Sequence, residues 1–164
     1  MPTYAIPLVE FDQEMTTTRR LLERVPDDKG DWKPHPKSFS LAHLAQLVAR
    51  MPGWIVGTLR QPNIDLASGA PYSTEKTSTL LAEFDRNVKS AREALEQVAD
   101  AKLGEPWSLV MGDKVMFTAP RGPVTRQTLS HLIHHRGQLT VYLRELDVAI
   151  PSIYGPTADE GWQA

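Results

Sequence analysis

The stretch VTRQTLSHLIHHRGQLTVYLRELD, residues 124–147, predicts one long amphipathic helix. Its apolar residues recur at spacings of three and four, which places their side chains on one face of an α-helix. His131 and His135 are one turn apart, so their side chains leave the axis only about 40° apart, on that same face. Two imidazoles are therefore predicted on the side that faces the core. The apolar residues of this face are Leu132, Leu139, Tyr142, Leu143 and Leu146.

Three earlier segments show the same periodicity and predict three more helices. The first runs from about residue 8 to 25, and the second runs from a serine cap at 38 or 40 to about 60. The third begins at a cap at 73 or 74 and extends for about 25 residues. The four helices predict an all-α protein, a four-helix bundle with long irregular links, as a single domain over residues 1–164.

Prolines and glycines interrupt this pattern at two places. Pro52 lies inside the second helix and predicts a kink or local break near Met51, because proline removes one backbone hydrogen bond. Between the third and fourth helices, the stretch SLVMGDKVMF, residues 108–117, predicts a short hairpin that turns at Gly112 and Asp113.

The composition excludes several classes of function. The chain has no cysteine, so thiolate nucleophiles, disulfide scaffolds and cysteine-ligated metal sites are excluded, and a cytoplasmic location is expected. The formal net charge of −2 argues against a nucleic-acid partner. No apolar run is long enough to span a membrane, and the N-terminus lacks the basic and apolar regions of a secretion signal.

Histidines are the strongest candidates for a functional site. Two buried imidazoles side by side cannot both be protonated without repulsion, and a divalent cation between them would resolve this. His43, on the apolar face of the second helix, is the candidate third ligand beside His131 and His135. Three such ligands would bind Zn, Ni or Fe(II) and leave coordination positions for water or substrate. The alternative is that these histidines are core residues that hydrogen-bond within the protein.

The segment from His131 through His135, Arg136, Gly137, Gln138 and Leu139 resembles the DinB/YfiT-like superfamily of metal-binding four-helix bundles. The resemblance extends to Leu143-Arg144, Pro151-Ser-Ile-Tyr-Gly155, Trp32-Lys-Pro-His-Pro36 and Ser40-Leu-Ala-His43, and so covers most of the chain in order. It implies that His43, His131 and His135 are the metal ligands, the same three that the helical faces select.

Residues around the ligands receive subsidiary predictions. Gln138, one turn beyond His135, is expected to support a ligand or contact a metal-bound water, and Trp54 and Tyr142 are expected to form walls of a pocket. Gly137, with Ile133 and Val141 off the core face, predicts a homodimer interface. Arg136 is expected to pair with a carboxylate of a neighbouring helix or to hold an anionic ligand. His35 and His134 are expected to lie outside the site.

Relatives in the superfamily imply a metal-dependent thiol S-transferase, and a bound cation would equally support hydrolysis. In either case the substrate is a small molecule, and a low-molecular-weight thiol is the expected cosubstrate of the transferase, since the chain has no cysteine of its own. The alternatives are a metal-binding stress or regulatory bundle without turnover, and a dimerisation module with hydrogen-bonded core histidines.

Overall fold

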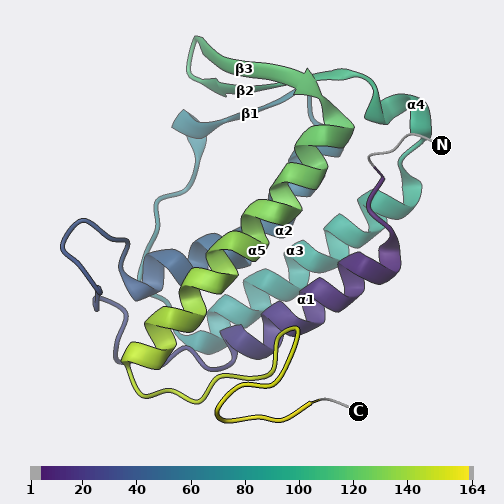
Figure 1. The fold of residues 1–164 in the computed structure, drawn as a ribbon. Helices are drawn as coiled ribbons and strands as arrows, with labels where there is room; N and C mark the ends of the chain where they lie inside the picture. The colour runs from purple at the N-terminus through teal and green to yellow at the C-terminus, as the bar shows by residue number, and fades with distance from the viewer. Residues whose placement is uncertain (1–4, 163–164) are drawn as a thin grey trace.

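A computed structural model describes residues 5–162, so the first four and last two residues of the predicted 1–164 domain lie outside the described residues. Four long helices run side by side, with a small sheet at one end and an irregular C-terminal tail at the other (Figure 1). The elements in order are α1 (Leu8–Leu22), α2 (Leu41–Arg60), β1 (Asn63–Asp65), η1 (Leu66–Ser68), α3 (Thr77–Gln97), α4 (Asp100–Leu103), β2 (Pro106–Met111), β3 (Lys114–Pro120) and α5 (Arg121–Glu145).

The predicted bundle is confirmed, and α2 is its centre. This helix packs against both α3 and α5, while α1 packs against α3 and α5 from the other side. The apolar faces of all four helices join in one core, as their three- and four-residue spacing requires. Fully buried members from the four helices include Phe11, Leu44, Phe84 and Leu139.

The start of α2 is fixed by a side-chain cap. The Ser40 hydroxyl accepts a hydrogen bond from the backbone N–H of His43 at 3.2 Å, which satisfies one of the free donors of the first turn. Of the kink or local break predicted near Met51, the break is wrong, because the helix continues through Pro52 to Arg60. Asn87 of α3 donates to the carbonyl of Ala49 at 3.0 Å, beside the position where proline removes a backbone donor.

The all-α prediction is wrong in one respect, since a three-stranded sheet in the order β1-β2-β3 closes one end of the bundle. The predicted hairpin is confirmed as the antiparallel pair β2–β3, with Gly112 at φ +56° in its turn. Strand β1 was not predicted, and it pairs in parallel with β2 from 45 residues away along the chain, Asn63 opposite Ser108. Gly57 lets β1 approach α2, because a Cβ there would lie 2.8 Å from the Ile64 side chain.

Helix boundaries differ from the predictions by a few residues. Helix α1 ends at Leu22, before 25, and α3 begins at Thr77 rather than at 73 or 74. Helix α5 begins at Arg121, ahead of Val124, and ends at Glu145. The earlier start is possible because Pro123 lies in the first turn, where a missing N–H costs no helical hydrogen bond. No helix of the described residues is long and apolar enough to cross a membrane.

Candidate metal centre

Helix α5 brings two of the predicted ligands together. The Nε2 atoms of His131 and His135 are 2.8 Å apart, within hydrogen-bonding distance. His135 is buried, with 8% of its surface exposed, whereas His131 lies at the surface of a cavity. The spacing of one helical turn therefore directs both nitrogens at a common point on the inner side of α5.

Gln138 sets the orientation of the buried histidine. Its Oε1 atom lies 2.7 Å from Nδ1 of His135. An amide oxygen only accepts, so this contact places the proton of His135 on Nδ1 and leaves a lone pair on Nε2. That lone pair faces His131, and Nε2 of His135 is therefore the atom that would coordinate a cation.

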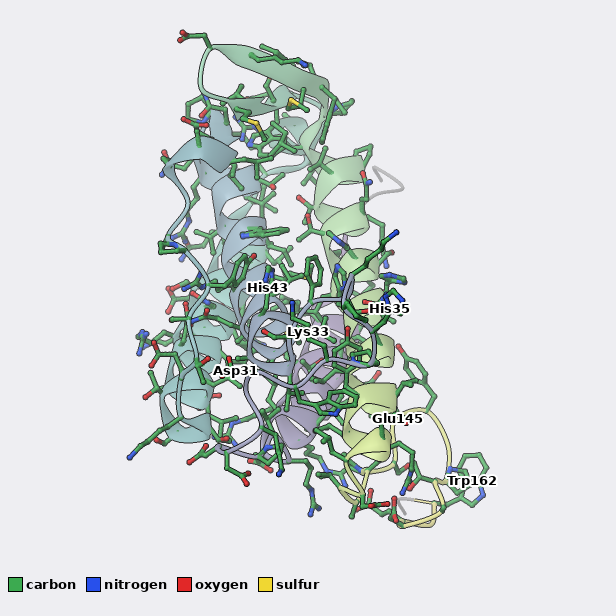
Figure 2. All side chains as sticks on the ribbon, turned by 90° about the vertical axis from the view of Figure 1, so that its left-hand side faces the viewer. Asp31, Lys33, His35, His43, Glu145 and Trp162 are labelled. Carbon is green, nitrogen blue, oxygen red and sulfur yellow. The ribbon has the colours of Figure 1, made fainter. Side chains whose placement is uncertain are left out.

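His43 approaches from α2 within a stack of rings. Its imidazole lies between Phe39, at 4.2 Å between ring centroids, and Tyr72, at 3.9 Å, and both contacts are nearly parallel. The Arg50 guanidinium covers the outer side of the Tyr72 ring at 5.0 Å. Figure 2 shows His43 near the middle of the molecule and His35 apart from it on the preceding connector.

The donor set fits a metal in its chemistry. Neutral imidazoles are ordinary ligands of Zn, Ni and Fe(II), and Nε2 of His131 and Nε2 of His135 already converge. Within residues 5–162, however, no three His, Asp or Glu side chains stand close enough together to hold an ion. The stacked His43 ring would have to turn toward the pair to become the third ligand.

The environment favours neutral imidazoles at all three positions. Burial is the main cause of a lowered pKa for His43, His131 and His135. The neighbouring His135 lowers the pKa of His131 further, and Arg50 does the same for His43. For His135, the hydrogen bond with Gln138 acts in the opposite direction. Neutral rings keep the lone pairs that metal binding requires.

A cavity of about 660 Å³ opens beside His131. It lies between α2 and α5 and is bounded by the sheet and by the link from Leu66 to Tyr72. Its size is within the range of sites for small molecules. Lining residues from the helices and sheet are Arg50, Trp54, Thr58, Ile64, Asp65, Glu83, Trp107, Leu109, Phe117, Val124, Gln127, Thr128 and His131.

The two predicted wall residues have different positions. Trp54 lines the cavity and its ring lies 6.1 Å from that of His131. Tyr142 does not line this cavity, which corrects its predicted role. Its hydroxyl donates to the carbonyl of Phe39 at 3.2 Å and its ring meets the edge of Trp32 at 5.5 Å, so it fastens the connector that precedes α2.

Three residues at the site were missed from the sequence: Phe39, Arg50 and Tyr72. Phe39 and Tyr72 lie in links without periodicity, 33 residues apart, so no local pattern pairs them. The one available signal was the presence of aromatic residues in polar, proline-containing links, where apolar rings need a partner. Arg50 also pairs with Glu83 of α3 at 3.1 Å, which no spacing within a single helix indicates.

Arg136 and Gly137 of the motif lie outside the histidine pair. Arg136 is buried and pairs with Glu14 of α1 at 2.7 Å, the first of its two predicted roles. A Cβ at Gly137 would meet nothing within 4 Å, so the close approach expected there does not come from the described part of this chain. Ile133, predicted to lie off the core face, packs partly against the core, whereas Val141 is 57% exposed.

The two histidines predicted outside the site remain peripheral. His35 accepts a hydrogen bond from the backbone of Lys37 at 3.1 Å, as part of its connector. His134 is exposed, and its ring meets the edge of His135 at 5.0 Å between centroids. Neither lines the cavity.

Comparisons with known proteins agree with this architecture. The uncharacterised protein YrdA of Bacillus subtilis (strain 168) is 27% identical over 158 residues, which cover 93% of this chain and 89% of YrdA. A crystal structure of the DinB-like protein YjoA of Bacillus subtilis matches 93% of this chain and 97% of its own, with a TM-score of 0.69 and 19% identity. A DinB-like protein from Bacillus cereus matches 90% and 95%, with a TM-score of 0.68 and 23% identity.

These two structural matches establish a shared fold. The model of the DinB family matches residues 6–163, nearly the whole sequence. The resemblance noted in the histidine-containing motif is thereby confirmed, and the chain belongs to the DinB family.

Proposed function

We propose that this protein is a metal-dependent enzyme of the thiol S-transferase or hydrolase type, with a divalent Zn, Ni or Fe ion held by His43, His131 and His135. The observation that carries the proposal is the pair of Nε2 atoms 2.8 Å apart, in which His131 lines a cavity of about 660 Å³ and His135 is buried behind it. A core pair that served only packing would not need to adjoin a space of this size.

The residues of the chain would divide the work at this site. His131 and His135 present their Nε2 atoms from adjacent turns of α5, and Gln138 holds His135 in the tautomer with a free lone pair. The ring of Trp54 lies 6.1 Å from that of His131, in the wall of the same cavity. Phe39 and Tyr72 hold the ring of His43 between them, so the position of this third ligand depends on both links that precede a helix.

A cation held by three neutral imidazoles would lower the pKa of a bound water or thiol and polarise a carbonyl group. A small-molecule substrate would occupy the cavity, and a low-molecular-weight thiol would supply the sulfur in the transferase reaction. No described carboxylate other than Asp65 and Glu83 lines the cavity, and both are engaged in hydrogen bonds. We therefore assign no protein side chain as general base.

Metal content is the first experiment. Untagged protein purified without chelator should contain one equivalent of a divalent metal by elemental analysis. His43→Ala, His131→Ala and His135→Ala should each lose it, since removal of one of three ligands leaves an incomplete site. His35→Ala and His134→Ala are matched controls and should retain the metal. A full equivalent of tightly bound metal in both His43→Ala and His135→Ala would refute the three-histidine site.

Turnover then separates an enzyme from a metal-binding protein without catalysis. The metal-loaded protein is assayed with a panel of small thiols and a chromogenic electrophile, and with simple esters for hydrolysis. We expect activity that depends on the metal and disappears in His131→Ala. Equal rates in the native protein and this variant would favour a regulatory or structural bundle.

Dimerisation remains a separate proposal with a separate measurement. The outer side of α5 carries Gly137, with open space above its Cα, and the exposed Val141. A second copy could approach closely there, because glycine has no side chain to keep it away. Light scattering should give the mass of two chains for the native protein and of one chain for Val141→Glu. A monomeric native protein would refute the proposal.

A further inference from the structure

The cavity beside His131 has a graded lining. Val124 and His131 both line the cavity and are seven residues apart on α5, which corresponds to about 10 Å along the helix axis. At the Val124 end the walls are the apolar side chains of Trp107, Leu109 and Phe117 from the sheet. At the other end are His131 and the pair Arg50 and Glu83. The cavity is thus mainly apolar at the sheet, where Asp65 of β1 is the charged exception, and polar at His131.

The charged groups of the lining are already paired. Arg50 donates from Nε to Glu83 at 3.1 Å and from Nη1 to the carbonyls of Ala70 and Pro71 at 2.9 and 3.2 Å. Its guanidinium plane lies over the ring of Tyr72. These contacts tie the link to α2 beside the cavity, and the ion pair with Glu83 balances the charge of Arg50.

The two carboxylates of the lining, Asp65 and Glu83, also disfavour an anionic ligand. Asp65 accepts from the backbone N–H groups of Ala67 and Gly112, both at 2.9 Å, and Glu83 accepts from Arg50. Among the described residues, Arg50, Asp65 and Glu83 are the charged side chains of this lining apart from the histidine, so their formal sum is −1. In the metal-free protein, an anionic ligand would lose hydration, would be repelled by two carboxylates, and would meet one cation, Arg50, that is already paired with Glu83.

We infer that this cavity binds an uncharged small molecule with an apolar, preferably aromatic, body about 10 Å long, whose reacting polar group lies beside His131. The apolar body would pack between Trp54, Trp107 and Phe117, which offer flat ring surfaces from a helix and from the sheet. The inference rests on the proposed function, because it identifies this cavity as the substrate site. In the metal-free protein it disfavours ligands with carboxylate, sulfonate or phosphate groups in this cavity.

Two fluorescent probes with the same aromatic frame test the charge preference. N-phenylnaphthylamine is uncharged, and anilinonaphthalene sulfonate carries one added negative group. Each probe is titrated into the metal-free protein, so that its binding does not depend on a bound metal. Its fluorescence is excited directly. The uncharged probe should bind at one site per chain, and the sulfonate should bind weaker by about tenfold or more, because like charges placed together disfavour binding. Equal or tighter binding of the sulfonate would overturn the inference.

Variants place the probe in the cavity. Gln127→Trp fills the mouth from an exposed position on α5 and should weaken the uncharged probe by about tenfold, since a blocked pocket removes the apolar contacts. Val141→Trp adds the same residue to the outer side of the same helix and should leave binding unchanged. Equal effects of the two substitutions would overturn the assignment to this cavity.

The charge argument has its own variant. Glu83→Gln removes one carboxylate and frees Arg50 from its ion pair, so it should narrow the difference between the two probes by strengthening sulfonate binding. An unchanged ratio of the two affinities would overturn the role given to this pair.

The failure of this inference can be separated from the failure of the proposed function. The double variant of His131→Ala and His135→Ala should lose metal and still bind the uncharged probe. Metal bound by the native protein together with a preference for the sulfonate would overturn the inference alone. A histidine-independent metal content together with selective binding of the uncharged probe would overturn the proposed function alone.

Discussion

His135 and Arg136 are neighbours on α5, yet their side chains leave the helix about 100° apart and have different surroundings. Arg136 is 1% exposed and enters a closed network with Glu14 at 2.7 Å, Thr18 at 3.1 Å and Tyr154 at 2.7 Å. The Tyr154 hydroxyl in turn donates to Glu14 at 2.9 Å, which completes a ring of contacts. On the cavity side, His131 and His135 contact each other and retain the capacity to bind a further group.

The difference shows how one short motif combines stability and function. A buried guanidinium needs partners for its donors and its charge, so Arg136 ties α5 to α1 and to the C-terminal tail. The imidazoles, whose pKa values burial lowers, have fewer partners: His135 contacts Gln138 and His131, and His131 lines the cavity. The contacts of Arg136 with α1 and the tail fix the rotation of α5 about its own axis, and this rotation determines where the two histidines point.

The largest expected effect comes from breaking the closed side. Glu14→Gln removes the charge that compensates the buried Arg136, and we expect the free energy of unfolding to fall by about 3 kcal/mol or more. Urea denaturation measures this change. Glu10→Gln is the control, because its pair with Arg126 is more exposed and should contribute less than about 1 kcal/mol. Similar losses in the two variants would contradict the structural role of the Arg136 network.

On the side of α5 that carries His131 and His135, stability should depend on bound metal. With free Zn or Ni at about one hundred times the dissociation constant, the native protein should gain about 2.7 kcal/mol of stability, because the ion binds only the folded state. Thermal unfolding with and without added metal measures this gain. His131→Ala should show no gain and His134→Ala the full gain. An equal response in both would place metal binding outside the histidine pair.

A smaller effect is expected at the residue that orients His135. Gln138→Leu removes the acceptor on Nδ1 and should weaken metal binding by about tenfold, as loss of a hydrogen-bond partner behind a ligand does. Competition with a colorimetric chelator measures the affinity. Gln127→Leu, a substitution of another glutamine on the same helix, is the control and should change it little. Unaltered affinity in Gln138→Leu would show that the contact does not orient the ligand.

The smallest effect concerns the tail that carries Tyr154. Asp159 accepts hydrogen bonds from the Arg144 side chain and from the backbone of Ile150, and these contacts hold the pKa of its carboxyl below the usual range. The unfolded state therefore binds the proton more readily. The stabilisation is present above the ordinary pKa of an aspartate and is lost as the pH falls through the lowered value in the folded state.

We expect Asp159→Asn to remove this part of the acid dependence, measured as unfolding free energy between about pH 6 and pH 3. The loss of stability should be visible at neutral pH and should vanish toward the acid end. Asp113→Asn, in the exposed hairpin turn, is the control. A pH-independent difference between Asp159→Asn and the native protein would contradict the proposed cause.

Much of the helical architecture could be predicted from local pattern. The spacing of Leu44, Leu47 and Met51 gave the buried face of α2, and all three are buried. Ser40 was one of two predicted caps, and its side chain binds the first turn. Strand β1 could not be predicted, because three residues carry no periodicity and their pairing partner is distant in the sequence. The same limit explains the unpredicted turn of helix at α4.

The candidate site divides in the same way. The one-turn spacing of His131 and His135 was sufficient to predict that their side chains meet, and their Nε2 atoms are 2.8 Å apart. Their role as metal ligands, together with that of His43, remains a prediction. Tyr142 was predicted on the correct face of α5. Its contacts with Phe39 and Trp32 could not be predicted, because they depend on where the connector before α2 crosses α5.

The sequence by itself determined the four helices, the hairpin turn and the shared face of two histidines, since each depends on residues within a few turns of one another. Only the tertiary structure decided the partner of Arg136, the ring stack around His43 and the cavity closed by β1 and its link. These features join residues as far apart in the sequence as His43 and Tyr72 or Glu14 and Arg136, and such contacts depend on how whole helices pack.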